Sequence, residues 1–165
     1  MNIRAATAND AEAISALIRS VAHFFTLRPD GAGAEDFLKT ISPDAIEGYI
    51  NAPHFRCHVG FISDQLAGVV AIRDNKHLYH LFVVPPFQRR GFAKQLWEFA
   101  KAEAISLGNP GAFTVNSTPY AVPVYASFGF IQIGARVEAN GIAFVPMKLA
   151  IHAGERSGAS GPGAL

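Results

Sequence analysis

The stretch His77–Trp97, which reads HLYHLFVVPPFQRRGFAKQLW, decides the fold of this chain. An apolar run ends at a double proline, a short basic turn with one glycine follows, and an amphipathic helix then begins. The first N–H groups of a helix have no partner inside the helix, and the helix dipole favours negative charge at that end. The sequence therefore predicts a strand, an anion-binding turn and a helix in immediate succession, an arrangement that suits a diphosphate group.

The turn supplies two kinds of group for an anion. Gly91 lets the backbone approach a phosphate without a Cβ in the way, and Arg89 and Arg90 supply positive charge. The backbone N–H groups from Arg89 to Lys94 are the expected cradle. At least one arginine is expected to pair with a phosphate and the other to be solvated; an exposed basic loop is the alternative. The turn lacks the Gly-Lys-Ser/Thr of a P-loop, which argues against magnesium–nucleotide chemistry.

Upstream of the turn, the sequence predicts an antiparallel meander. Residues 55–62 and 66–73 are apolar runs joined by a tight turn, so they form a hairpin. A second turn leads into the strand 77–83. Alternation along that strand places Tyr79 on the same face as His77 and His80 on the opposite face.

Downstream of the turn, the spacing of apolar residues predicts a helix from Phe92 to about Leu107, which Gly108–Gly111 terminates. Residues 112–116 then form a strand that should run parallel to 77–83. A strand–helix–strand unit of this kind crosses over with a right hand.

The two ends of the chain complete the pattern. A first strand near residues 3–6 precedes a helix with apolar residues at helical spacing from Ala13 to Val21, and Ser42 with Pro43 predicts the start of a second helix. The loop 26–36 between these helices is expected to shape a substrate pocket. The remaining expected elements are a short helix at 119–127, a turn into a strand at 128–133, a strand at 142–149, and a loop at 138–141.

Composition narrows the class of protein. With 165 residues, of which 50% are hydrophobic and 16% charged, the chain is expected to form one domain over residues 1–152, followed by a flexible tail at 153–165. A net charge of +1 argues against a general nucleic-acid binder. The single Cys57 excludes an intrachain disulfide or a cysteine-based metal site, and no metal is expected.

Other features bear on location and on binding surfaces. No stretch approaches the length of a membrane span, so a cytoplasmic location is expected. Among the thirteen phenylalanines core packing is the default, with some rings expected in a ligand groove or an oligomer interface. A homodimer is left open.

The chain resembles the GNAT superfamily of N-acetyltransferases over roughly residues 1–150. The turn Gln88–Ala93 is similar to the family's Q/R-x-x-G-x-G/A loop, and Tyr125–Phe130 to its Tyr-x-x-x-Gly-Phe element; Val115–Ser117 occupies the place of the following strand. The one departure is Ala93 in the last small position. The resemblance implies an α/β (α+β) fold: a mixed, mostly antiparallel central sheet with a splayed parallel strand pair and flanking helices.

The resemblance also implies where acetyl-CoA binds. The turn would hold the diphosphate, and the splayed strand would bind the pantetheine arm like an added strand, with one N–H polarising the thioester carbonyl. Asn116, a polar residue in an apolar strand, would bind pantetheine or the acceptor from the other side. The implied residues are Leu81, Phe82, Val83, Gln88, Arg89, Arg90, Gly91, Phe92, Ala93, Lys94 and Asn116.

Two residues are candidates for catalysis. Tyr125 is the candidate general acid for the departing thiolate, and the alternative is a packing tyrosine; Tyr120 is less well placed because it does not precede the Gly-Phe pair. His77 stands where some family members carry a catalytic glutamate, and its ordinary pKa near 6.5 suits a general base. A turn-capping role for His77, a core role for His80, and proton loss through water are the alternatives.

The expected function is transfer of the acetyl group of acetyl-CoA to a primary amine by direct attack in a ternary complex. The alternative is a non-catalytic acyl-CoA-binding sensor or interaction module of the same fold. Cys57 is a poor candidate for a covalent nucleophile because no activating neighbour is evident. The acceptor amine stays open. Acidic residues of nearby loops that could attract a cationic amine, or could simply be solvated, are Asp30, Glu35, Asp36 and Glu138.

Overall fold

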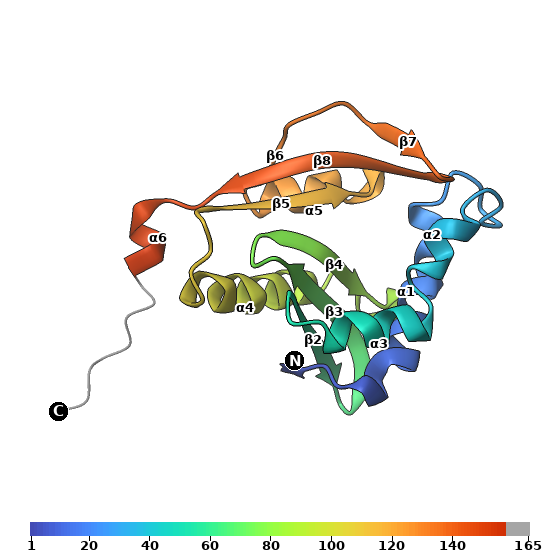
Figure 1. Cartoon of the computed structure of the whole chain (residues 1–165), viewed down its shortest axis with the longest axis horizontal. Coiled ribbons are helices and arrows are strands. Elements are labelled where there is room, and N and C mark those ends of the chain that lie inside the picture. Colours follow the sequence, from blue (N-terminus) through green and yellow to red (C-terminus); the bar gives the residue numbers. More distant parts are fainter. Residues whose placement is uncertain (158–165) are drawn as a thin grey trace.

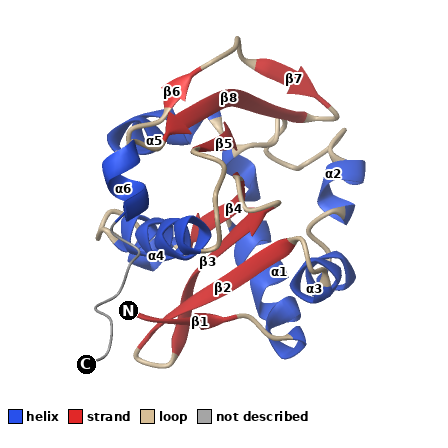
Figure 2. Ribbon diagram, turned by 60° about the vertical axis from the view of Figure 1, so that its left-hand side comes forward, coloured by secondary structure: helices blue, strands red, loops and turns tan. Residues whose placement is uncertain are grey.

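The computed structural model describes residues 1–157 as a mixed sheet with helices on both faces (Figures 1 and 2). The strand order is β1-β2-β3-β4-β5-β8-β6, and β7 pairs with β8 beside this path. Every pair is antiparallel except β4 with β5, in agreement with the predicted fold class. The strands are β1 (Asn2–Ala5), β2 (Phe55–Ile62), β3 (Gln65–Arg73), β4 (His77–Val83), β5 (Ala112–Ser117), β6 (Ile131–Gln132), β7 (Val137–Ala139) and β8 (Ile142–Ala150).

The helices begin where the sequence offers suitable first residues. The hydroxyl of Ser42 accepts a hydrogen bond from the N–H of Ala45 at 3.2 Å, and Pro43 occupies the first turn, as predicted. No helix within residues 1–157 is long and apolar enough to cross a membrane. The helices are α1 (Ala11–Ser20), α2 (Glu35–Lys39), α3 (Pro43–Asn51), α4 (Phe92–Ser106), α5 (Val122–Ser127) and α6 (Ala153–Ser157).

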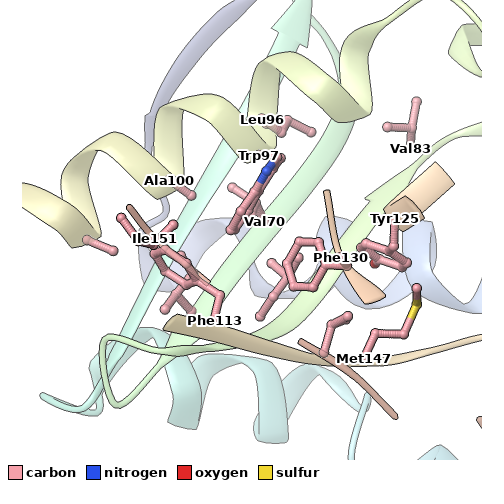
Figure 3. Packing of buried hydrophobic residues seen from close by; sticks show 14 of the residues in the cluster. Val70, Val83, Leu96, Trp97, Ala100, Phe113, Tyr125, Phe130, Met147 and Ile151 are labelled. Carbon is pink, nitrogen blue, oxygen red and sulfur yellow. The ribbon is translucent and has the colours of Figure 1, made fainter. Parts of the chain in front are cut away.

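Alternate residues of β3 belong to two separate cores, one on each face of the sheet, because successive side chains of a strand point to opposite faces. Val70 packs with Leu96 and Trp97 of α4, whereas Val69 packs with the buried residues of α1 and α3. Figure 2 shows α4 on one side of the strands and α1 and α3 on the other. The Trp97 ring is fully buried and meets Phe113 edge-on at 5.0 Å (Figure 3). These two cores fix β4 in position.

The parallel pair β4–β5 separates soon after it begins. Only His77 with Thr114 and Leu78 with Val115 are in register, although β4 continues to Val83. Beyond this point β4 stays paired with β3 on its other side, and β5 stays paired with β8. The predicted splayed pair is therefore present. It opens the sheet between two well-formed halves.

Four details differ from the sequence expectations. The five-residue α2 interrupts the connection that was expected to be a loop, and β7 forms beside β8 where part of the loop 138–141 was expected. The register of β3 with β4 shifts between Ala71 and Ile72, so the rings of Tyr79 and His80 both pack against Tyr49 instead of facing opposite ways.

The fourth difference concerns the predicted flexible tail. Residues Ala153–Ser157 form the short helix α6, and the Glu155 carboxylate accepts a hydrogen bond from Nζ of Lys101 on α4 at 2.9 Å. The small residues of this segment did not predict a helix. The rest of the expected tail, residues 158–165, lies outside the described residues.

Candidate functional site

A cleft of about 660 Å³ lies where β4 and β5 separate. Its walls come from β4, the turn after β4, the start of α4, the end of β5, the segment around α5, and the residues that follow α1. Ten of the thirteen sequence-predicted site residues line it. These are Leu81, Phe82, Val83, Gln88, Arg89, Gly91, Ala93, Lys94, Asn116 and Tyr125.

The turn before α4 directs a series of backbone N–H groups outward. Arg89 and Gly91 both have left-handed backbone conformations, with φ of 60° and 81°, which only glycine adopts without strain. The first helical hydrogen bond runs from the N–H of Gln95 to the carbonyl of Gly91. Within residues 1–157, no group accepts a hydrogen bond from the six preceding N–H groups, 89–94. A helix N-terminus of this form binds anions.

The side chains of the turn add positive charge without neutralising partners. Arg89 and Lys94 form no ion pair with the described part of the chain, and the first turn of α4 contains no acidic residue. The Arg90 guanidinium lies over the rings of Phe87 and Phe92, at 5.6 and 5.2 Å. Arg90 and Phe92 themselves do not line the cleft. The uncompensated charge makes the end of the cleft beside the turn electropositive.

Gln88 has a structural role that its position in the turn motif does not reveal. Its Nε2 donates a hydrogen bond to the carbonyl of Val83 at 2.9 Å. The bond joins the turn to the last residue of β4, so the N–H groups of the turn and the open edge of β4 keep a fixed relative position. Gln88 thus holds the two binding surfaces together while also lining the cleft.

The open edge of β4 forms one wall and Asn116 of β5 belongs to the facing wall. Leu81, Phe82 and Val83 pair with β3 on one side, and no strand of residues 1–157 pairs with them on the other. A strand edge of this kind can add an extended ligand through main-chain hydrogen bonds. The Asn116 side chain is exposed to the cleft, and its amide has no hydrogen-bond partner within residues 1–157.

Tyr125 on α5 is buried, and its hydroxyl has no hydrogen-bond partner among the described residues. Its side chain is 7% exposed and lines the cleft. Burial raises the pKa of Tyr125 above its ordinary value, so the phenol stays protonated at neutral pH. The ring packs edge-on against Phe130 at 5.7 Å (Figure 3), and Gly129, with φ of 96°, turns the chain so that Phe130 reaches it.

His77 does not reach the cleft. It lies at the start of β4, where the strands are still paired, and its Nδ1 is 2.7 Å from the hydroxyl oxygen of Thr114. Desolvation by burial lowers the pKa of His77, and the nearby Arg73 acts in the same direction. His80 is buried, and desolvation lowers its pKa to about 3. The geometry gives neither histidine access to a substrate in this cleft.

Sequence reasoning missed an aromatic part of the cleft. Phe24, just after α1, stacks on Tyr120 with the ring centroids 4.7 Å apart, and Phe25 lies 6.0 Å from Phe82. All four rings line the cleft. The high phenylalanine content was the available signal, but nothing local connects Phe24 with Tyr120. No cluster of three or more His, Cys, Asp or Glu that could hold a metal ion occurs in residues 1–157.

Comparison with known proteins gives one family and many similar folds. A family model described as an acetyltransferase (GNAT) domain matches residues 25–151. No curated protein matches the chain. Solved structures similar in fold include a GCN5-related N-acetyltransferase from Rhodopseudomonas palustris, with a TM-score of 0.76, 15% identity, and 91% of this chain and 95% of that one covered.

Two further similar structures contain coenzyme A. The PaiA N-acetyltransferase of Thermoplasma acidophilum, in complex with coenzyme A, has a TM-score of 0.73 at 15% identity, with 90% of this chain and 98% of that one covered. An aminoglycoside 6'-N-acetyltransferase complexed with coenzyme A has a TM-score of 0.69 at 14% identity, with 92% and 98% covered. At such identities the likeness concerns the fold.

Proposed function

Because the chain belongs to the GNAT acetyltransferase family, we propose that it transfers the acetyl group of acetyl-CoA to a primary amine by direct attack in a ternary complex. One observation carries the proposal. A single cleft contains an anion-binding helix start, an open strand edge and a protonated, unpaired Tyr125. These are the groups that a diphosphate, an amide-containing arm and a departing thiolate require.

The diphosphate would bind at the turn. Six backbone N–H groups, 89–94, are available there, and Arg89 and Lys94 line the same end of the cleft. Hydrogen bonds to charged acceptors are about twice as strong as neutral ones. Arg90 is held over two rings and contributes charge at longer range. Phe92 supports that arginine and offers its backbone N–H.

The pantetheine arm would lie along the open edge of β4. Its amide groups match the unpaired main-chain groups of Leu81 to Val83, and the Asn116 amide faces them from β5. This placement brings the thioester into the gap between the strands. A β4 N–H aimed at the thioester carbonyl would stabilise the negative charge that develops on its oxygen.

The chemical step uses the lone pair of a neutral amine. The nitrogen attacks the carbonyl carbon, a C–N bond forms, the C–S bond breaks, and coenzyme A leaves as a thiolate. Tyr125 donates a hydrogen bond and then its proton to that sulfur. The amide nitrogen releases its extra proton to solvent, and solvent returns a proton to the Tyr125 phenolate. The raised pKa of Tyr125 keeps the donor protonated.

Cys57 offers no competing covalent route. Burial raises the pKa of its thiol to about 11, and the residue lies in β2 outside the cleft. Of the two protonation states of a cysteine, only the thiolate is an effective nucleophile. This supports direct transfer to the amine.

Solvent, not a histidine, is proposed to take the proton of the entering ammonium. His77 is removed from the cleft, and the aromatic end disfavours a charged amine because desolvation lowers the pKa of an ammonium. The free energy of deprotonation then depends on the amine itself. We expect kcat/KM to rise with pH until a midpoint that moves with the pKa of the chosen amine.

The test measures free thiol released from acetyl-CoA with a panel of primary amines, at several pH values. Turnover whose midpoint follows the amine, with an unchanged profile in His77→Gln, is expected. A midpoint that is the same for every amine and lost in His77→Gln would restore His77 as the base. Tight acetyl-CoA binding without turnover on any amine would instead favour a non-catalytic binding module.

A further inference from the structure

We propose that the acceptor is a small monoamine with an aromatic or branched aliphatic body, bound at the aromatic end of the cleft beside Phe24 and Tyr120. The inference rests on the proposed function and adds the chemical class of its acceptor. It begins from the charge of the cleft. Of the residues that line it, Arg89 and Lys94 are charged, both positively, and no Asp or Glu of residues 1–157 is among them.

A polycationic acceptor should bind weakly to a cleft with this charge distribution. Aminoglycosides and polyamines carry several ammonium groups, and each group that leaves water needs a carboxylate or an equivalent acceptor. Within residues 1–157, the lining of the cleft offers no carboxylate for such a group. An ammonium group that is buried without a partner discriminates against the ligand that carries it.

Carboxylates of the surrounding loops do not supply this missing negative charge, because each forms a hydrogen bond or an ion pair with a residue close to it in sequence. Asp30 accepts from the N–H of Ala32 at 3.0 Å, and Glu35 accepts from the N–H of Gly33 at 3.1 Å. The ion pairs of the remaining carboxylates are Asp36 with Lys39 at 3.2 Å and Glu138 with Arg136 at 2.8 Å. None of these acidic residues lines the cleft.

An apolar surface takes the place of the missing carboxylates. The apolar surface has three sources. Val21, Phe24 and Phe25 lie just after the end of α1, Phe82 belongs to β4, and Tyr120 lies just before α5. The stacked pair Phe24–Tyr120 joins segments on the two sides of the open sheet. Tyr120 keeps 56% of its surface exposed, so much of its ring is free to contact a ligand.

The position of this surface suits an acceptor whose body is apolar. The turn, Tyr125 and the open edge of β4 line the same cavity as these rings. An aromatic or branched body would be buried against the rings, which favours binding through loss of apolar surface from water. Its single amine would then point toward the gap between β4 and β5 and enter in the neutral form.

The first experiment compares kcat/KM for four amines at one pH, using thiol release by the full chain with saturating acetyl-CoA. Phenethylamine and isoamylamine are expected to exceed spermidine and kanamycin by roughly tenfold or more, since burying one such body is worth at least that factor. Spermidine or kanamycin equal to or better than the monoamines would overturn the inference while leaving the proposed function intact. No turnover on any amine would contradict the proposed function, and with it the inference that rests on that function.

The second experiment changes the aromatic surface. Tyr120→Ala should raise KM for phenethylamine about tenfold while KM for acetyl-CoA changes less than about twofold. Phe99→Ala is the matched control, because Phe99 is a 41% exposed ring on α4 outside the cleft. Tyr120→Glu should shift the kcat/KM ratio toward spermidine. An unchanged phenethylamine KM in Tyr120→Ala, or an unchanged ratio in Tyr120→Glu, would contradict the inference.

Discussion

At the scale of single residues, Tyr125 connects a local sequence pattern with a chemical property. The pattern places Gly129 and Phe130 after the tyrosine; the glycine reverses the chain and the phenylalanine packs on the tyrosine ring. That packing buries the phenol, and burial keeps it protonated. The same three residues therefore build the end of α5 and prepare the proposed acid.

Tyr125→Phe should lower kcat about a hundredfold, because a positioned general acid contributes at least that much, and should change KM for acetyl-CoA less than about twofold. The phenyl ring keeps its contacts with Phe128 and Phe130, so the melting temperature should stay within a few degrees. Tyr49→Phe, which removes a hydroxyl outside the cleft, is the control. Unchanged kcat in Tyr125→Phe would remove this residue from the mechanism.

His80 should make the protein sensitive to acid. Desolvation lowers its pKa to about 3 in the folded state, while the unfolded chain titrates near 6.5. As the pH falls below 6.5, the unfolded state binds a proton that the folded state does not, so stability decreases until the pH approaches 3.

His80→Phe should therefore reduce the slope of unfolding free energy against pH in this window by up to about 1.4 kcal/mol per pH unit. Urea unfolding between pH 4 and 7, monitored by circular dichroism, measures it. His152→Gln is the comparison, because His152 is exposed. If the slope in His80→Phe matches that of the parent protein, His80 is not the group responsible.

Residues of the cleft differ in how far the sequence reveals them. The turn and the Tyr125 element could be predicted because each is a short contiguous pattern whose residue types are tied to backbone conformation or charge. The Phe24–Tyr120 stack could not, because the two residues come together only through the sheet topology. The base role predicted for His77 gains no support from the geometry, because β4 is paired with β5 at that level and His77 does not line the cleft.

At the scale of elements, long periodic segments were predicted well and short ones were not. The strands β2, β3 and β4 and the helix α4 have strong apolar patterns and lie where expected. By contrast, α2 and α6 have five residues each, and the three exposed residues of β7 owe their conformation to pairing with β8. Such elements depend on tertiary contacts that a local pattern does not encode.

The two ends of α4 offer a matched test of the anion site. Gly91 and Gly108 both have positive φ, of 81° and 85°, and an added Cβ would meet no atom at either. Gly91→Ala and Gly108→Ala should each cost about 1 kcal/mol of unfolding free energy. Only Gly91→Ala should weaken acetyl-CoA binding, roughly tenfold by calorimetry, because it disturbs the cradle. Equal affinity in the two variants would argue against the site.

At the scale of the whole molecule, the sheet consists of two halves that share a narrow joint. The strands β1 to β4 form one half and β5 to β8 the other, and two residue pairs connect them. The core around Trp97 and Phe113 holds the halves together on the α4 face (Figure 3). Residues of both halves line the cleft, so a ligand bound there contacts both halves at once.

Acetyl-CoA should accordingly stabilise the whole fold. At a concentration of a hundred times its Kd, it should add about 2.7 kcal/mol to the unfolding free energy. Differential scanning fluorimetry measures the shift in Tm, and hydrogen exchange should show new protection at residues 79–83 of β4. Free adenine at the same concentration is the control. Protection confined to one half of the sheet would contradict binding across the cleft.

The turn before α4 also bears on how this sequence can change over evolutionary time. Its six available N–H groups belong to the main chain, so most amino acids at 90, 92, 93 and 94 would present the same donors. The two positions with restricted choice are Arg89 and Gly91, whose φ values of 60° and 81° most residues resist. Selection on such a surface acts on backbone shape more than on side-chain identity, and the loop can drift far in composition while it keeps its affinity for anions.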